Sequence, residues 1–475
     1  MIRLVTPLLT ALALGFAFAC ILWPRRQRLL RDLPLVIFLS VGLGFGISSL
    51  LFFLWLLAFG QAGSAFAAFE IPFVLILTAF ALLFRRRRAR AASLVTETVQ
   101  VRRAGSKLEW IAAVIFLATL LAAIRGFMWF VHGALNGGWD AWGIWNLRAK
   151  FLFLGGSHWS DAFSAKGSLS HTDYPLLIPA SVARAWSYVG SDIPQVPILI
   201  GALFTAATAG LLFSSLSTLR SRIQGLLAAT VLLASPFFIV LGTAQYADVP
   251  LGFFMLSTLV LLCLHESAAK EGGSMMALAG TSAGLAAWTK NEGVLFLVCL
   301  LLGHLSLAMG RRNLRSHLQQ LPPFVAGLAP VLLMVAYFKL HFAGHNDLFS
   351  SLTTALKMLG RIARWRVVAR AFADQLLHFG GWVVVPVTPF LALYILLVGV
   401  AKQMGNSLKI CLRALSLTAL GYFFVYIVAP VPLDWLLQTS LNRVLVQLWP
   451  SILFLVFVAT NPPQGELPIG KEAGN

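Results

Sequence analysis

The sequence predicts an all-α polytopic membrane protein with about thirteen transmembrane helices and almost no soluble mass. Of its 475 residues, 59% are hydrophobic and only 11% are charged, whereas a soluble domain carries roughly 25% charged residues. Apolar runs that approach or exceed the roughly 20 residues of a membrane span recur along the whole chain. Thirteen spans use roughly 260 residues by that measure, so no long soluble domain fits between them.

The apolar runs give the bounds of the expected spans, and the loops between them give the orientation. The spans are 5–23, 33–59, 69–84, 108–131, 194–217, 225–241, 250–265, 275–288, 293–309, 322–340, 381–400, 412–430 and 447–460. The loops rich in Lys and Arg all fall on one side, namely 24–32, 85–107, 218–224, 310–321 and 401–411. Because cytoplasmic loops carry this excess, that side is expected to be cytoplasmic. The loops expected outside are 132–193, 242–249, 289–292, 341–380 and 431–446.

The net charge of +19 follows this membrane pattern, and no nucleic-acid partner is expected. The basic residues stand in short clusters beside apolar spans, as in the run 85–90. The segment 357–370 is also basic, yet it falls outside. Its apolar residues recur at helical spacing, which favours an amphipathic helix in the outer interface, and a miscounted span is the alternative.

The longest outer loop carries an acid among aromatic residues. Asp140 lies between Trp139 and Trp142, and two glycines precede this group. Tryptophan is common at membrane interfaces, which accounts for the two rings but not for the carboxylate. A carboxylate in this setting is well placed to act as a general base. We therefore predict that Asp140 is catalytic and that Trp139 and Trp142 contact substrate.

The same loop continues into His171, Asp173 and Tyr174, directly before a proline. A residue before proline is extended, and Asp and Thr favour turns, so a plain turn explains this segment. It equally suits the polar wall of an outer cavity. Both interpretations stay open, and the three residues are candidates for substrate binding.

Three shorter outer segments add further polar candidates. Tyr246 and Asp248 stand at the start of a span, where an ionisable residue is a functional candidate, although a helix N-cap also explains the acid. Lys290 and Glu292 occupy a tight turn between two spans. Lys290 opposes the positive-inside trend and suits a phosphate partner, with a solvated turn as the alternative. Arg443 suits bidentate phosphate recognition or snorkelling to a lipid phosphate.

These segments lie far apart in the sequence but face the same side of the membrane at the ends of spans. Together they supply carboxylates and cations. A reaction between a phosphate-bearing lipid and an acceptor hydroxyl needs both, because cations hold the leaving phosphate and a carboxylate takes the acceptor proton.

The order of the motifs resembles that of the GT-C superfamily of integral membrane glycosyltransferases. The most similar branch contains the protein O-mannosyltransferases and the lipid A aminoarabinose transferases. The first-loop acid of that branch matches Asp140 in Gly-Gly-Trp-Asp-Ala-Trp, and its second-loop acid matches Asp248 in Tyr-Ala-Asp-Val-Pro-Leu. The remaining similarities are Asp173-Tyr174-Pro175-Leu176, Thr289-Lys290, and Ser440 and Arg443 followed by Pro450.

The resemblance covers roughly residues 108–460 and leaves 1–107 as additional N-terminal helices with a basic cytoplasmic loop. Three spans thus precede the one that leads into the acidic loop, where the family usually has one. Asp140 also lacks the adjacent second acid of some members. Within the catalytic module, 341–380 is the expected amphipathic outer segment, and 461–475 is expected to be a disordered tail.

The resemblance implies an inverting glycosyltransferase that moves a sugar from a polyprenyl-phosphate donor to a lipid, glycan or protein acceptor. It implies that Asp140 is the base and that Lys290 and Arg443 bind the lipid phosphate. Asp248 would hold the first loop or help to bind a divalent cation, Mg²⁺ or Mn²⁺. The expected setting is a bacterial inner membrane and cell-envelope glycan biosynthesis, with the site facing the periplasm and membrane lipids around it.

Two alternatives remain at this point. A transporter or flippase of lipid-linked saccharides would want charges near the bilayer midplane and broken helices in matched halves. An O-antigen ligase or polymerase would also use outer-loop cations on a polyprenyl diphosphate, but it needs no carboxylate in a long first loop.

Overall fold

All the regular elements that the structure, a computed structural model, describes are helices, which confirms the predicted all-α fold. The described residues are 2–24, 29–92, 106–164, 170–267, 273–309, 321–344, 351–382 and 386–463. The helices are α1 (Ile2–Leu22), α2 (Leu29–Phe59), α3 (Ser64–Ala92), α4 (Lys107–Gly133), η1 (Ala141–Trp145), α5 (Asn146–Leu154), η2 (Gly156–Phe163), α6 (Leu177–Val189), α7 (Gln195–Leu219), α8 (Arg222–Leu233), α9 (Pro236–Thr243), α10 (Asp248–Ser267), α11 (Gly273–Thr289), α12 (Asn291–Met309), α14 (Leu321–His341), α15 (Leu352–Leu359), α16 (Ile362–His378), η5 (Phe379–Gly381), α17 (Val387–Val398), α18 (Asn406–Val428) and α19 (Leu433–Ala459).

Ten of the described helices are long and apolar enough to cross a membrane, or eleven if the bent pair of α8 and α9 counts as one span. That pair bends by 66°, where Pro236 begins α9 and cannot donate a backbone hydrogen bond to α8. Each of the thirteen predicted spans coincides with a helix or with this pair. Eleven spans are counted and not thirteen, because α11 with 17 residues and α17 with 12 are shorter than the ten long helices. The chain is therefore a polytopic membrane protein.

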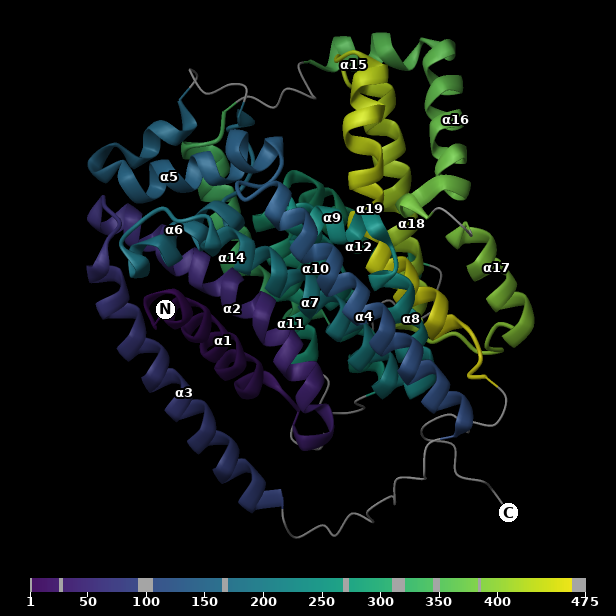
Figure 1. Cartoon of the computed structure of the whole chain (residues 1–475), viewed down its shortest axis with the longest axis horizontal. Coiled ribbons are helices and arrows are strands. Elements are labelled where there is room, and N and C mark those ends of the chain that lie inside the picture. The colour runs from purple at the N-terminus through teal and green to yellow at the C-terminus, as the bar shows by residue number, and fades with distance from the viewer. Residues whose placement is uncertain are drawn as a thin grey trace.

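Two long helices present apolar side chains outward along most of their length. In the apolar 18-residue stretch of each helix, only 22% of α3 and 11% of α4 is buried inside the protein. Leu75 and Ile76 on α3 and Leu117 and Leu121 on α4 are among the exposed side chains. Monomeric soluble proteins rarely expose apolar surface of this extent, so these faces suit lipid. Figure 1 shows α3 along one flank of the bundle and α17 along the opposite flank.

The last helix differs most from its prediction. Residues 431–446 were expected to form an outer loop, but α19 begins at Leu433 and continues to Ala459. Asp434, Ser440 and Arg443 therefore lie on a helix, and the loop prediction is wrong. A hydropathy pattern scores each polar residue as exposed, whereas here neighbouring helices supply partners for the polar side chains of α19. Pro450 lies inside this helix, as proline does more often in membrane helices than in soluble ones.

The expected amphipathic helix at 357–370 is two helices. The chain breaks at Gly360 between α15 and α16. In Figure 1, α15 lies across the upper ends of α18 and α19, and α16 descends beside them. Arg364 of α16 donates to the carbonyl oxygens of Tyr426 and Ala429, at 3.0 and 2.7 Å. A cation is favoured at a helix C-terminus, so this arginine holds α16 against the end of α18.

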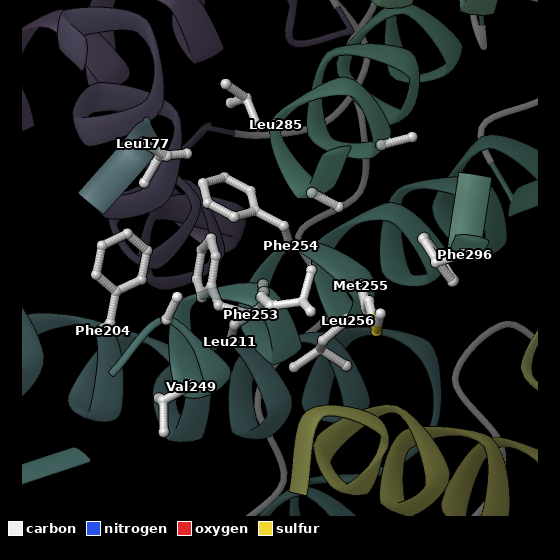
Figure 2. Close-up of a cluster of buried hydrophobic side chains, with 14 of the residues drawn as sticks. Leu177, Phe204, Leu211, Val249, Phe253, Phe254, Met255, Leu256, Leu285 and Phe296 are labelled. Carbon is white, nitrogen blue, oxygen red and sulfur yellow. The ribbon is translucent and has the colours of Figure 1, made fainter. Parts of the chain in front are cut away.

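Helix α10 forms the centre of the bundle, and 94% of its apolar window is buried. Its Phe253 and Phe254 meet Phe204 of α7 with ring centroids 5.7 and 5.9 Å apart. Figure 2 shows these rings together with Leu177 of α6 and Leu285 of α11. This packing brings the start of α10, where Asp248 lies, between several other helices.

A buried ion pair attaches the N-terminal helices to the rest of the bundle. Arg184 on α6 contacts Glu70 on α3 at 2.8 Å, and both side chains are fully buried. The guanidinium also donates to the Pro7 carbonyl and to Thr10 on α1, at 2.9 and 2.8 Å. Tyr188 donates to the same carboxylate at 2.6 Å. Five polar groups from three helices thus satisfy one another inside the bundle.

Removing one partner of this pair is expected to destabilise the protein strongly. Glu70→Gln leaves the guanidinium of Arg184 buried without a counter-ion, which costs about 3–5 kcal/mol. Asp192→Asn, which breaks the surface pair with Lys150 at side-chain exposures of 39% and 51%, is the matched control and should cost about 0–1 kcal/mol. Reversible unfolding in detergent micelles measures both, and equal effects would contradict a structural role for the buried pair.

Candidate active site

The first loop packs against the second through two glycines. Gly137 has a φ of +75°, and the Gly138 amide donates to the Ala244 carbonyl at 3.1 Å. A Cβ atom on Gly138 would lie 2.3 Å from the hydroxyl oxygen of Tyr246, which is closer than real atoms approach. The same hydroxyl accepts from the backbone amide of Asp140 at 3.3 Å. The glycines therefore allow the close contact that fixes Asp140 at the start of η1.

Arg443 joins the acids of the two loops. Its Nη2 donates to Asp140 Oδ2 at 2.6 Å and to Asp248 Oδ2 at 3.0 Å. The guanidinium also lies 4.4 Å from the centroid of the Tyr246 ring. One arginine on α19 thus connects Asp140 beside η1 with Asp248 at the start of α10. We use the name ionic network for six residues: Asp140, Tyr246, Asp248, Lys290, Glu292 and Arg443.

Lys290 contacts the other side of the same carboxylate. Its ammonium lies 3.0 Å from Asp248 Oδ1 and 2.8 Å from Glu292 Oε1, and 5.6 Å from the centroid of the Tyr174 ring. Burial alone would lower the pKa of Lys290, but the charges of Asp248 and Glu292 outweigh it and raise that pKa above its usual range. The lysine therefore remains a cation at any physiological pH.

Tyr246 keeps its proton for a related reason. Burial, and then the charge of Asp140, raise the pKa of Tyr246 above its ordinary value. Its neutral hydroxyl can therefore accept from the amide of Asp140 and still carry a hydrogen.

Two residues that sequence reasoning missed complete the surroundings of Asp248. Gln447, one turn after Arg443 on α19, donates from Nε2 to Asp248 Oδ1 at 2.6 Å. Tyr422 on α18 donates to Gln447 Oε1 at 2.7 Å. Because the tyrosine occupies the amide oxygen, the amide nitrogen is directed at the carboxylate. The sequence held one signal, since Gln447 follows Arg443 at i, i+4 spacing and has apolar neighbours on both sides in the chain.

Gln447→Leu is expected to weaken both stability and activity. The change removes a donor from Asp248 and leaves the buried Tyr422 hydroxyl without its acceptor, which costs about 1–3 kcal/mol. Gln375→Leu on α16 is the matched control, since the buried Oε1 of Gln375 has no hydrogen-bond partner among the described residues. Thermal unfolding with and without substrate measures the effect. An unchanged midpoint in Gln447→Leu would contradict the role assigned to this hydrogen bond.

The second part of the first loop forms a wall beside the network. The Tyr174 ring stacks on Trp145 with centroids 5.5 Å apart and on His171 at 5.3 Å. Arg148, fully buried, donates to the carbonyl oxygens of Tyr174 and Ser170 at 2.8 and 2.6 Å. Burial lowers the pKa of Arg148 to about 10. The segment is both a turn, with the Tyr174 amide donating to the His171 carbonyl at 3.0 Å, and a wall of the site.

Asn291 and Lys339 extend this wall and were also missed by sequence reasoning. Asn291 donates to Asp173 Oδ2 at 2.6 Å. Lys339, in the last turn of α14, donates to Asn291 Oδ1 at 2.6 Å and to the carbonyl oxygen of Asp173. Lys339 falls at the predicted outer end of its span, as Lys290 does, so the same departure from the positive-inside trend was a usable signal.

The two predicted tryptophans lie outside the ionic network. Trp139 and Trp142 meet edge to face with centroids 5.6 Å apart, and their exposures are 51% and 55%. Their predicted contact with substrate stays a prediction. The structure does bring together Asp140, Tyr246, Asp248, Lys290, Glu292 and Arg443, with His171, Asp173 and Tyr174 beside them.

The surroundings of Asp248 do not fit the divalent cation considered for it. Its two oxygens accept from Arg443, Lys290 and Gln447, so a metal ion would face two positive charges. Across the described ranges, no group of three His, Cys, Asp or Glu side chains is placed to hold a metal ion. Mg²⁺ and Mn²⁺ prefer several oxygen ligands, whereas both oxygens of Asp248 already accept hydrogen bonds.

Residues 175–338 match the family model described as dolichyl-phosphate-mannose-protein mannosyltransferase. The match supports a membrane glycosyltransferase of the GT-C type. It spans less than half of the chain and includes Asp248, Lys290 and Glu292, whereas Asp140 and Arg443 lie outside it and join the site through their contacts. No curated protein matches the chain, and no solved structure does.

Proposed function

We propose that the protein is an inverting glycosyltransferase that moves a sugar from a polyprenyl-phosphate donor to an acceptor hydroxyl at the outer face of the membrane. The observation that carries the proposal is the ionic network. It places the first-loop acid Asp140 within 2.6 Å of Arg443 and connects it through Asp248 to Lys290. The family match over 175–338 supports the same reaction class.

The proposed reaction is a single displacement at the anomeric carbon. The acceptor oxygen forms the new bond to that carbon, and its proton passes to the Asp140 carboxylate. The bond from the anomeric carbon to the phosphate oxygen breaks, and its electron pair stays with the polyprenyl phosphate. Arg443 and Lys290 hold this leaving group by charge-assisted hydrogen bonds. Attack opposite the leaving group inverts the configuration.

The other residues of the network position these groups. Asp248 binds both cations on its two oxygens, and Gln447 and Tyr422 fix that carboxylate in turn. Tyr246 holds the backbone of Asp140 and the face of Arg443. The proposed acceptor is a lipid, a glycan or a protein, and the proposed location is a bacterial inner membrane with the site toward the periplasm. The family match does not favour a transporter or a ligase.

A transfer assay tests the proposal directly. The protein in nanodiscs is given polyprenyl-phosphate hexoses and candidate acceptors, and loss of sugar from the carrier is measured. We expect one donor to be consumed and NMR to show an inverted anomeric configuration in the product. Consumption of no donor, or retention of configuration, would overturn the proposal.

Lys290→Met is expected to raise the KM for the donor by about 10- to 100-fold, because one charged hydrogen bond to the phosphate is worth about 1.5–3 kcal/mol. Lys357→Met is the matched control, since Lys357 is exposed on α15, and its KM should stay unchanged. Initial rates over a range of donor concentrations measure both variants. An unchanged KM in Lys290→Met would remove this residue from the phosphate site.

A further inference from the structure

A cavity of about 350 Å³ opens beside the ionic network, and the roles assigned above leave it unused. Its polar wall consists of Asp173, Asn291 and Lys339, and its apolar wall includes Val294, Leu295 and Ala343. Asn291 stands between Lys290 and Glu292 in the chain, so the turn at 290–292 contributes residues to both the cavity and the network. The volume lies within the range of about 300–1,000 Å³ that is usual for small-ligand pockets.

The polar wall retains hydrogen-bonding capacity toward the cavity. The ammonium of Lys339 has three hydrogens, and it donates to two oxygens within the described residues. The amide nitrogen of Asn291 has two hydrogens, and one of them binds Asp173 Oδ2. Each side chain therefore keeps one donor for a ligand, and the existing contacts hold both donors in place.

The charges of this wall favour a neutral ligand. The Lys339 ammonium donates to the backbone carbonyl of the buried residue Asp173, and the nearby Asp173 carboxylate partly offsets the charge of the lysine. A phosphate in the cavity would meet that carboxylate at close range, whereas the described residues that line the cavity include neither Arg443 nor Lys290. A ligand with hydroxyl groups on one edge and C–H groups on a face matches donors opposite an apolar wall.

We propose that this cavity binds a neutral hexopyranose ring, with Lys339 and Asn291 donating to ring hydroxyls and Val294, Leu295 and Ala343 packing against its C–H face. The inference deepens the proposed function, on which it rests for the origin of the ring. The ring belongs either to the sugar of the lipid-linked donor or to a glycan acceptor, and the same chemistry serves both.

Direct binding of methyl hexopyranosides tests the cavity without requiring turnover. Saturation-transfer NMR on the protein in nanodiscs is recorded with the methyl α- and β-glycosides of mannose, glucose and galactose. We expect at least one to bind the wild type. Ala343→Leu fills the cavity, Lys339→Met removes a donor, and each should weaken binding at least tenfold.

Controls separate the cavity from general damage to the protein. Ala355→Leu and Lys357→Met make the same changes on α15 and should bind the glycoside as the wild type does. Asp140→Asn should also retain binding, since it changes only the ionic network. Thermal unfolding of each variant shows whether it is folded. If Ala343→Leu does not fold, Lys339→Met tests the cavity in its place. Binding of no glycoside by the wild type, or binding as tight as that of the wild type by both cavity variants, would overturn the proposal.

The transfer assay then identifies the source of the ring. A raised KM for the donor alone in Ala343→Leu assigns the cavity to the donor sugar, and a raised KM for the acceptor alone assigns it to the acceptor. Glycoside binding without any transfer would remove the proposed function and leave the cavity site standing. Asp140-dependent transfer with both KM values unchanged in the cavity variants would support the proposed function and remove the cavity as a sugar site.

Discussion

Asp140→Asn is expected to reduce sugar transfer by about 10²- to 10⁴-fold, which is the usual contribution of a general base. Asparagine has nearly the same shape and can still accept a hydrogen bond from Arg443, but it cannot take the acceptor proton. Arg443 also keeps its contact with Asp248 at 3.0 Å. The loss should therefore appear in kcat, with the KM for the donor and the thermal unfolding midpoint close to those of the wild type.

The matched control is Asp161→Asn in η2, an exposed acid of the same loop whose ion-pair partner among the described residues is His158 at 4.0 Å. Its transfer rate should equal that of the wild type. Equal rates in Asp140→Asn and in the wild type would exclude Asp140 as the base and leave the ionic network without a catalytic role.

Asp248→Asn is expected to reduce both stability and sugar transfer. The change leaves Arg443 and Lys290 in a buried site with less compensating charge, and it places an amide nitrogen next to donors. Breaking a buried ion pair in this way costs about 3–5 kcal/mol. Thermal unfolding and size-exclusion chromatography in detergent measure the loss, and we expect a lower midpoint together with little or no transfer.

Asp374→Asn on α16 is the control for Asp248→Asn. Asp374 lies at the surface beside His378, with more than half of each side chain exposed, so its midpoint should not change. A stable Asp248→Asn protein would contradict the view that this carboxylate holds the two cations together. The pair of predictions also separates two roles, since Asp140→Asn should affect rate alone and Asp248→Asn both properties.

The positions of the membrane helices were predictable from the sequence because lipid offers the backbone no hydrogen-bond partners. Every peptide group in a span must pair within its own helix, so an apolar run of sufficient length gives a helix. The bounds failed where side chains from different helices pair with one another. Arg443 looked like part of a loop in a hydropathy pattern, yet it donates to Asp248 inside the bundle.

The candidate site was predictable to a similar depth. Asp140, Asp248, Lys290 and Arg443 stood out because each is a charge at the end of an apolar span, and that property is local. Which of them meet is not local, since the chain separates Asp140 from Arg443 by most of its length. Their shared contact, and the role of partners such as Tyr422, depends on how α18 and α19 pack against α10.

The buried pair of Arg184 and Glu70 bears on how far the protein can be divided. Residues 1–107 look dispensable when the chain is compared with a family that has fewer helices before the acidic loop. Yet Glu70 lies in α3, and two further acceptors of Arg184 lie in α1. A shortened chain that begins at α4 would place an arginine without a counter-ion on α6, directly after the wall formed by Asp173 and Tyr174. The additional helices are therefore not an appendage, since α6 depends on α1 and α3 for the partners of its buried arginine.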